Sequence, residues 1–181
     1  MTRIEHTTIL ALRSEKERKA VIASDGQATM DTVVIKSKTT KVHRLYEDRI
    51  LVGFAGATAE CLTLVERFEG KLNKYSGRLR RAAVEMTKEW RTDRVLRQLE
   101  AVLVVAAQEG ILMISGSGDV LEPDAEVIGI GSGGAYALAA ARAILSVAEL
   151  PIVEVARRSL EIASAIDIYT NSEISLEELS W

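Results

Sequence analysis

The sequence predicts an α+β fold in which two antiparallel sheets pack face to face and helices cover the outer face of each sheet. Three observations predict it: candidate strands occur in hairpin-linked blocks, candidate helices occur in pairs, and the order is strands, two helices, strands, two helices, strand. A parallel sheet would need strands and helices that alternate one by one. We therefore expect a four-layer αββα sandwich.

The composition is that of one globular domain, with 181 residues, 48% of them hydrophobic and 27% charged. A net charge of −3 argues against nucleic-acid binding. The single cysteine, Cys61, excludes an internal disulfide, and its apolar neighbours at helical spacing favour core packing over a nucleophile. The start has no signal-peptide core, and no run reaches the ~18 apolar residues of a membrane span, so we expect no membrane partner and a cytoplasmic protein.

The first third of the chain consists of candidate strands. Residues 7–13 and 19–25 are β-rich and are separated by the charged run SEKERK, which predicts a hairpin with a solvated tip. Polar breaks and the Asp25-Gly26 turn separate further candidate strands. These are residues 32–37, 41–46 and 49–56.

Apolar residues at helical spacing predict two pairs of helices. The first helix, from about 57 to 74, would bury Leu62, Val65, Phe68 and Leu72, and the second, after Gly77, would bury Leu79, Ala83, Met86 and Trp90. The later pair is expected at 135–147 and 152–166, with Pro151 at the start of the second helix. Strands are expected at 100–108, 110–116, 119–122, 126–131 and 173–179.

A glycine motif, Gly129-x-Gly131-x-x-Gly134, has the spelling of a dinucleotide-binding loop and raises the hypothesis of a nucleotide enzyme. It comes after 128 residues, however, and a dinucleotide fold alternates strands with helices. The acidic residues some 20 positions later lie at the boundary and in the body of helices. The context therefore disfavours nucleotide binding, and Ser132 is expected to cap the following helix.

Thr7 begins a candidate strand very early in the chain. A threonine hydroxyl becomes an effective nucleophile when its own freed α-amine accepts the proton. Such an amine titrates near ~7.7–8.0, and a neighbouring positive charge leaves it largely neutral. The chemistry also needs an acid to hold that cation and backbone donors for an oxyanion. Taken alone, Thr7 is better explained as an ordinary strand residue.

Seven ordered segments resemble the HslV (ClpQ) family, the bacterial peptidases related to the proteasome. They are TTILALR, VIASDGQAT, KVHRLYEDRILVGFAGATAE, EWRTDRVLRQLEA, ISGSGDVLEPD, IGIGSGGAYALAAARAIL and IYTN. The resemblance implies an N-terminal nucleophile hydrolase fold and threonine-dependent peptide hydrolysis inside two stacked six-membered rings. It also implies a partner AAA+ ATPase, HslU, which unfolds the protein substrates.

The resemblance further implies how the chain matures. Thr7 would be the nucleophile once residues 1–6 are removed, which leaves residues 7–181 as a single peptidase domain.

Other site residues are implied by position. Asp25 and Lys41 would tune and orient the threonine and its amine, and Gly53 would offer a backbone N–H to the oxyanion. Ser132 would sit beside the nucleophile.

The family also carries a monovalent cation, usually sodium, bound by backbone oxygens in a Gly-x-x-Cys-x-x-Thr pattern. The matching positions here are Ser164, Asp167 and Thr170, so two of the three depart from the pattern. Carbonyl ligands tolerate side-chain changes, and Asp167 would add a hard oxygen. We expect this cation and no organic cofactor.

A catalytically silent ring subunit is the main alternative to a peptidase. The joint presence of Thr7, Asp25, Lys41 and Ser132 argues against it.

Overall fold

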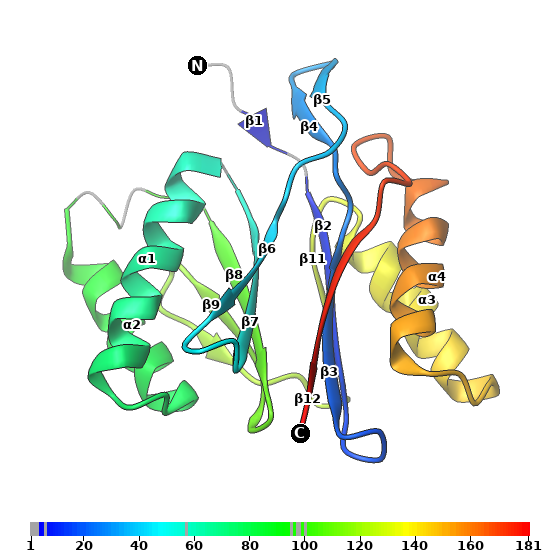
Figure 1. The fold of residues 1–181 in the computed structure, drawn as a ribbon. Coiled ribbons are helices and arrows are strands. Elements are labelled where there is room, and N and C mark those ends of the chain that lie inside the picture. Colours follow the sequence, from blue (N-terminus) through cyan, green and yellow to red (C-terminus); the bar gives the residue numbers. More distant parts are fainter. Residues whose placement is uncertain (1–3, 6, 57, 95, 97–98, 100) are drawn as a thin grey trace.

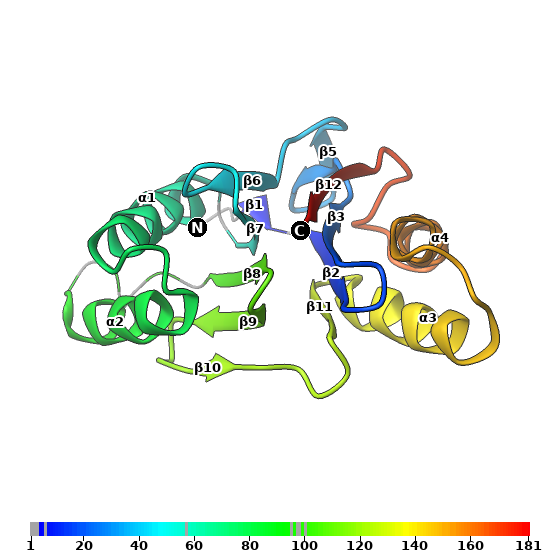
Figure 2. The ribbon, with the colours of Figure 1, turned by 60° about the horizontal axis from the view of Figure 1, so that its bottom comes forward.

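The structure, a computed structural model, describes residues 4–5, 7–56, 58–94, 96, 99 and 101–181. Helices α1 (Thr58–Lys74) and α2 (Leu79–Thr92) cover one sheet, and α3 (Gly134–Val147) and α4 (Ile152–Ser164) cover the other (Figure 1, Figure 2). The predicted four-layer sandwich is thereby confirmed. Positions 57 and 100, where a helix and a strand were expected to begin, lie outside the described residues.

Both sheets of the sandwich are antiparallel. The first has the strand order β10-β9-β8-β7-β6 and the second the order β11-β2-β3-β12. The strands of the first sheet are β6 (Val42–Leu45), β7 (Ile50–Ala55), β8 (Val102–Ala107), β9 (Gly110–Ser115) and β10 (Val120–Leu121). Those of the second are β2 (Thr8–Ser14), β3 (Lys19–Ser24), β11 (Val127–Gly131) and β12 (Ser175–Ser180).

A third, small sheet lies beyond one end of the sandwich. It joins β1 (Ile4–Glu5), β4 (Ala28–Met30) and β5 (Val33–Lys36) (Figure 1). The strand expected at 32–37 therefore exists but does not belong to the sandwich. Its apolar side chains stay roughly half exposed because no helical layer covers this extension; they are Val33, Val34 and Ile35.

Each inner strand contributes its alternate apolar residues to two different cores, one on each face of its sheet. In β2, Ile9 and Ala11 pack between the two sheets, whereas Leu10 and Leu12 pack against α3 and α4. Successive strand residues point to opposite faces, so a strand covered on both sides becomes apolar throughout.

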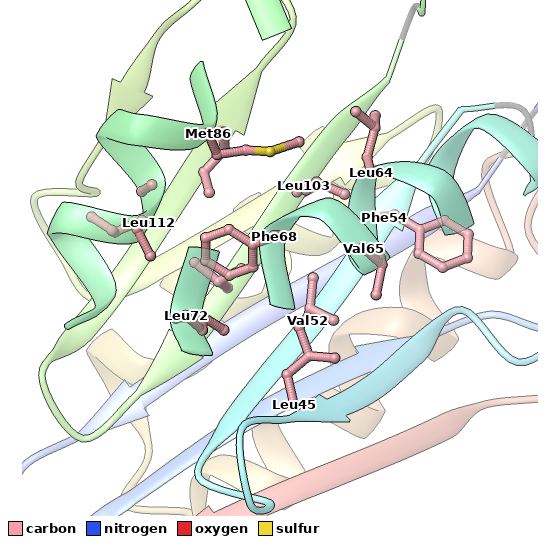
Figure 3. Packing of buried hydrophobic residues seen from close by; sticks show 14 of the residues in the cluster. Leu45, Val52, Phe54, Leu64, Val65, Phe68, Leu72, Met86, Leu103 and Leu112 are labelled. Atoms are coloured by element: carbon pink, nitrogen blue, oxygen red, sulfur yellow. The ribbon is translucent and has the colours of Figure 1, made fainter. Parts of the chain in front are cut away.

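The third core lies between the first sheet and the helices α1 and α2 (Figure 3). Phe68 and Leu72 of α1 are fully buried there, and so is Cys61, as predicted. Leu62 was wrongly placed on this face, since it is 41% exposed. The helix turns 100° per residue, so the stripe that begins at Cys61 continues through residues 64, 65 and 68 and leaves Leu62 outside. The inner face predicted for α2 is confirmed as buried.

The β2–β3 hairpin pairs without interruption from Ile9–Ser24 to Ser14–Lys19, and its tip at 15–18 is solvated as predicted. Glu17 leaves this tip and accepts a hydrogen bond from the Ile152 backbone N–H (3.1 and 3.3 Å to the two oxygens). It caps α4, whose own N-cap residue, a proline, provides no side-chain bond. This helix ends at Ser164, two residues before the expected end.

Among the described helices, none has the length and apolar character needed to cross a membrane.

Candidate active site

Thr7 lies immediately before β2 and is only 6% exposed. The antiparallel register pairs Thr8 with Gly131 of β11, which brings Ser132 to the same end of the sheet as Thr7. A β-carbon on Gly131 would lie 1.6 Å from the Thr7 carbonyl oxygen, and the Gly131 φ is +86°. Glycine is therefore required here so that the two backbones can approach.

The other two glycines of the motif pack a helix onto a strand. A β-carbon on Gly129 would lie 2.1 Å from the carbonyl oxygen of Gly134, the first residue of α3. The preceding strand, β11, is antiparallel to its described neighbour β2 and so does not form the parallel unit of a dinucleotide fold. Close backbone packing accounts for the motif.

A buried ion pair lies beside the start of β2. The Lys41 Nζ donates to Asp25 Oδ1 (2.8 Å) and to the Gln27 carbonyl (2.6 Å), and the side chains of Lys41 and Asp25 are 3% and 0% exposed. Asp25 Oδ1 also accepts the Thr8 N–H (2.8 Å), and Oδ2 accepts the Gln27 N–H (2.8 Å). The carboxylate thus ties the lysine to the backbone next to Thr7.

Burial lowers the pKa of Lys41 from its ordinary value, and the neighbouring Asp25 carboxylate opposes that shift. An ammonium group whose proton is less firmly held can exchange protons with a neighbouring amine or hydroxyl more readily than an exposed lysine.

Gly53 lies inside β7, paired with Val42 of β6 and Val104 of β8. A β-carbon there would lie 2.9 Å from Ile9 Cγ2 and 3.0 Å from Ile22 Cγ2. Glycine therefore allows the two sheets to pack closely at this point. Its backbone N–H as an oxyanion donor stays a prediction.

Ser132 does not cap α3, contrary to expectation. The N-cap position belongs to Gly133 and has no side-chain cap, while the Ser132 hydroxyl donates to Asp167 Oδ2 (2.7 Å). The same oxygen accepts the Thr170 hydroxyl (2.5 Å), and Oδ1 accepts the Tyr169 N–H (3.3 Å). The serine hydroxyl therefore acts as the donor of a charge-assisted hydrogen bond and not as the acceptor that an N-cap requires.

This network reaches the strand that carries Thr7. The hydroxyls of Thr8 and Thr170 are 2.6 Å apart, and the Gly133 N–H donates to Thr8 Oγ1 (3.0 Å). Thr8 is thus bonded both to the turn before α3 and to the segment after α4.

The three positions of the expected cation site form part of this network. Both carboxylate oxygens of Asp167 are engaged, and its carbonyl accepts the Thr170 N–H (3.1 Å). The Ser164 hydroxyl donates back to Glu161 in α4 (2.8 Å). The carboxylate is thus held by three donors. The cation itself, expected on backbone oxygens of these residues, stays a prediction.

Reasoning from the sequence missed Thr8 and Gln27, which anchor Asp25 and Lys41 through backbone groups. Backbone contacts leave no residue-type signal. The same reasoning also did not foresee that the Asp167 carboxylate accepts the Ser132 hydroxyl. The available signal was that Asp167 places a carboxylate where the family pattern has an uncharged cysteine.

Comparisons with known proteins agree with this geometry. Residues 4–179 match the family described as Proteasome subunit. A relative from Syntrophobacter fumaroxidans, named ATP-dependent protease subunit HslV, is 51% identical over 178 residues, which cover 98% of each chain. The solved structure of eukaryotic HslV from Trypanosoma brucei superposes with a TM-score of 0.90 at 41% identity, covering 96% of this chain and 99% of that one. The chain belongs to the proteasome subunit family, among its HslV members.

Proposed function

We propose that this chain is the threonine-type peptidase subunit of an ATP-dependent protease. The observation that carries the proposal is the buried Asp25–Lys41 pair, tied through Thr8 to the backbone beside Thr7. A threonine nucleophile needs such a cation, held by an acid, near its hydroxyl and amine.

Maturation would hydrolyse the peptide bond before Thr7. Water adds across that bond, the segment 1–6 leaves with a new carboxylate, and Thr7 gains a free α-amine. Residues 7–181 remain as one peptidase domain.

In the reaction, the neutral α-amine of Thr7 accepts the Oγ1 proton as Oγ1 attacks the substrate carbonyl carbon. The oxyanion is stabilised by backbone N–H groups, including that of Gly53. The carbon–nitrogen bond then breaks, the leaving amine takes the proton from the Thr7 ammonium, and an ester remains. Water hydrolyses the ester and restores the hydroxyl. Lys41 supplies the charge that lowers the pKa of the amine, Asp25 orients Lys41, and Ser132 lies beside the nucleophile.

The assembly is also part of the proposal. The relative is named an ATP-dependent protease subunit, so we infer a cytoplasmic complex of two stacked six-membered rings. A separate AAA+ ATPase, HslU, would feed it unfolded proteins.

Intact mass and peptide hydrolysis test the function together. We expect the expressed chain to lose residues 1–6 and to cleave a fluorogenic peptide in the presence of the ATPase. Thr7→Ala should abolish cleavage, whereas Thr92→Ala, which removes an exposed hydroxyl at the end of α2, should not. A stable full-length chain without cleavage would instead identify a silent ring subunit.

A further inference from the structure

We propose that Asn171 is a positioning residue for the Asp25–Lys41 ion pair. It lies in the segment between α4 and β12, and the reaction described above does not use it. Its side-chain amide ties the turn after Asp25 to the segment that leads into Lys41. The consequence for catalysis rests on the proposed function, whereas the consequence for the ion pair does not.

The Asn171 side chain joins three separate segments of the chain. Its Oδ1 accepts the backbone N–H of Gly26 (3.0 Å) and that of Glu173 (3.2 Å). Its Nδ2 donates to the carbonyl of Ser37 (2.9 Å), in the connection between β5 and β6. An amide oxygen accepts and an amide nitrogen donates, so one orientation of this side chain satisfies all three bonds.

Gly26 and Thr39 extend this attachment to the ion pair. The Gly26 carbonyl accepts the Thr39 N–H (2.8 Å), so both polar backbone groups of Gly26 are bonded. Asp25 directly precedes Gly26, and Lys41 follows Thr39 by two residues. The two charges, 2.8 Å apart, thus extend from backbone segments that Asn171 holds together. A buried pair depends on such fixed geometry, because its attraction offsets the cost of desolvation only when the geometry is good.

The space around Gly26 shows how closely these segments approach. A β-carbon on Gly26 would lie 2.5 Å from the Ser37 carbonyl oxygen and 3.1 Å from that of Glu173. Residue 26 therefore has no room for a side chain. Gly26, residues 37–39 and residues 171–173 form one close-packed contact, which we call the Asn171 junction.

An ion pair also crosses the Asn171 junction. Lys38 Nζ lies 3.0 Å from Glu173 Oε2, but the two side chains are 78% and 49% exposed. Exposed pairs of this kind contribute little to stability, because water screens the charges. The uncharged amide of Asn171 is therefore the attachment to test.

The accessibility of Lys41 tests the junction without any need for peptidase activity. Lys41 is 3% exposed and should resist acylation by an amine-reactive ester in the wild type. Asn171→Ala should raise its labelling rate about tenfold or more, because the segments around the ion pair open locally. Lys71, 19% exposed in α1, is the internal reference and should keep its rate. Mass spectrometry of the digested protein measures both lysines.

Asn73→Ala is the matched control, since it removes the same amide from an exposed position in α1. Both lysines should then label as in the wild type. Unchanged protection of Lys41 in Asn171→Ala would overturn the proposal. An equal rise at Lys71 would also overturn it, because Asn171 would then stabilise the whole domain and not the ion pair.

Gly26→Ala opens the Asn171 junction from the opposite side. The φ of Gly26 is not positive, so the effect of the added methyl group is steric. We expect Lys41 to gain accessibility in this variant too, and its continued protection would count against the junction.

The pH profile of the active enzyme tests the consequence for catalysis. The neutral Thr7 amine is the proposed base, and the Lys41 ammonium lowers its pKa. When Lys41 moves away in Asn171→Ala, the pKa of the amine rises. The acid limb of kcat/KM for a fluorogenic peptide should therefore move to higher pH by about half a unit or more, and kcat at neutral pH should fall about tenfold. The carboxylates bonded near this end of β2, Asp25 and Asp167, are present in both proteins.

A lower kcat with an unmoved acid limb would refute the positioning role, since general loss of structure changes the amount of active enzyme and not the pKa of its base. Labelling separates this proposal from the proposed function. If Lys41 becomes accessible in Asn171→Ala while the wild type cleaves no peptide, the junction is supported and the peptidase function fails.

Discussion

The carbonyl oxygen of Thr7 runs so close to Gly131 that a β-carbon on this glycine would lie 1.6 Å from it. Gly131→Ala would therefore push the backbone at Thr7 away from β11, in addition to the strain of an alanine at φ +86°. We expect the free energy of unfolding to fall by about 2 kcal/mol or more and peptide cleavage to be lost. Urea denaturation and a fluorogenic peptide assay measure the two effects.

Gly70→Ala is the matched control. Gly70 lies in α1, and a β-carbon there would meet nothing within 4 Å. The same substitution should raise stability by about 0.5–1 kcal/mol and leave cleavage unchanged. If both variants behaved alike, the close approach at Gly131 would have no energetic consequence.

Lys41→Met should lower kcat by about 10²–10⁴-fold, because the positive charge is lost. The rings should still assemble, because methionine fills the space of the aliphatic lysine stem. Size-exclusion chromatography checks assembly beside the peptidase assay. Lys16→Met is the control: Lys16 is 84% exposed at the β2–β3 hairpin tip and pairs only at 3.5 Å with Glu149. Substantial activity in Lys41→Met would remove Lys41 from the mechanism.

The lowered pKa of Lys41 also predicts how stability depends on pH. Between this lowered pKa and the ordinary value of 10.5, the unfolded chain binds more protons at Lys41 than the folded protein does. The stability difference between the wild type and Lys41→Met should therefore rise with pH through that window. Urea midpoints at fixed protein concentration measure it. A difference that falls with pH would mean that Asp25 dominates and that the pKa of Lys41 is raised.

The two sides of α1 should respond differently to truncation. Phe68 is fully buried in the core of Figure 3, so Phe68→Ala should cost about 3–5 kcal/mol in the free energy of unfolding. Leu62, 41% exposed on the same helix, should cost less than about 1 kcal/mol when changed to alanine. Equal losses would place Leu62 against a partner outside the monomer.

Glu17→Ala should destabilise the protein by about 1 kcal/mol, because the Ile152 N–H at the start of α4 loses its acceptor. Glu149→Ala serves as control, since this side chain is 94% exposed and should change stability by less than about 0.5 kcal/mol. Thermal unfolding of both variants, at one protein concentration, separates the two glutamates.

The layers were predictable from sequence. Strands linked by hairpins form antiparallel sheets, and the paired helices bury their apolar faces only by covering the outer faces of those sheets. Leu62 shows the limit of that reasoning, since an error of one residue in helical phase moves a side chain from core to solvent. The partner of Ser132 was not predictable, because Asp167 comes 35 residues later and reaches it only after α3 and α4 have packed together. Glu17 is similar, since its target lies 135 residues away.

The hydroxyls of Thr8 and Thr170 lie 2.6 Å apart although 162 positions separate them in the chain. The chain leaves the ribosome with its N-terminus first, so Thr8 emerges early and Thr170 almost last. The nascent polypeptide consequently has no complete site during most of its synthesis. A degradative subunit built in this order cannot damage the newly made proteins around it before it is itself finished.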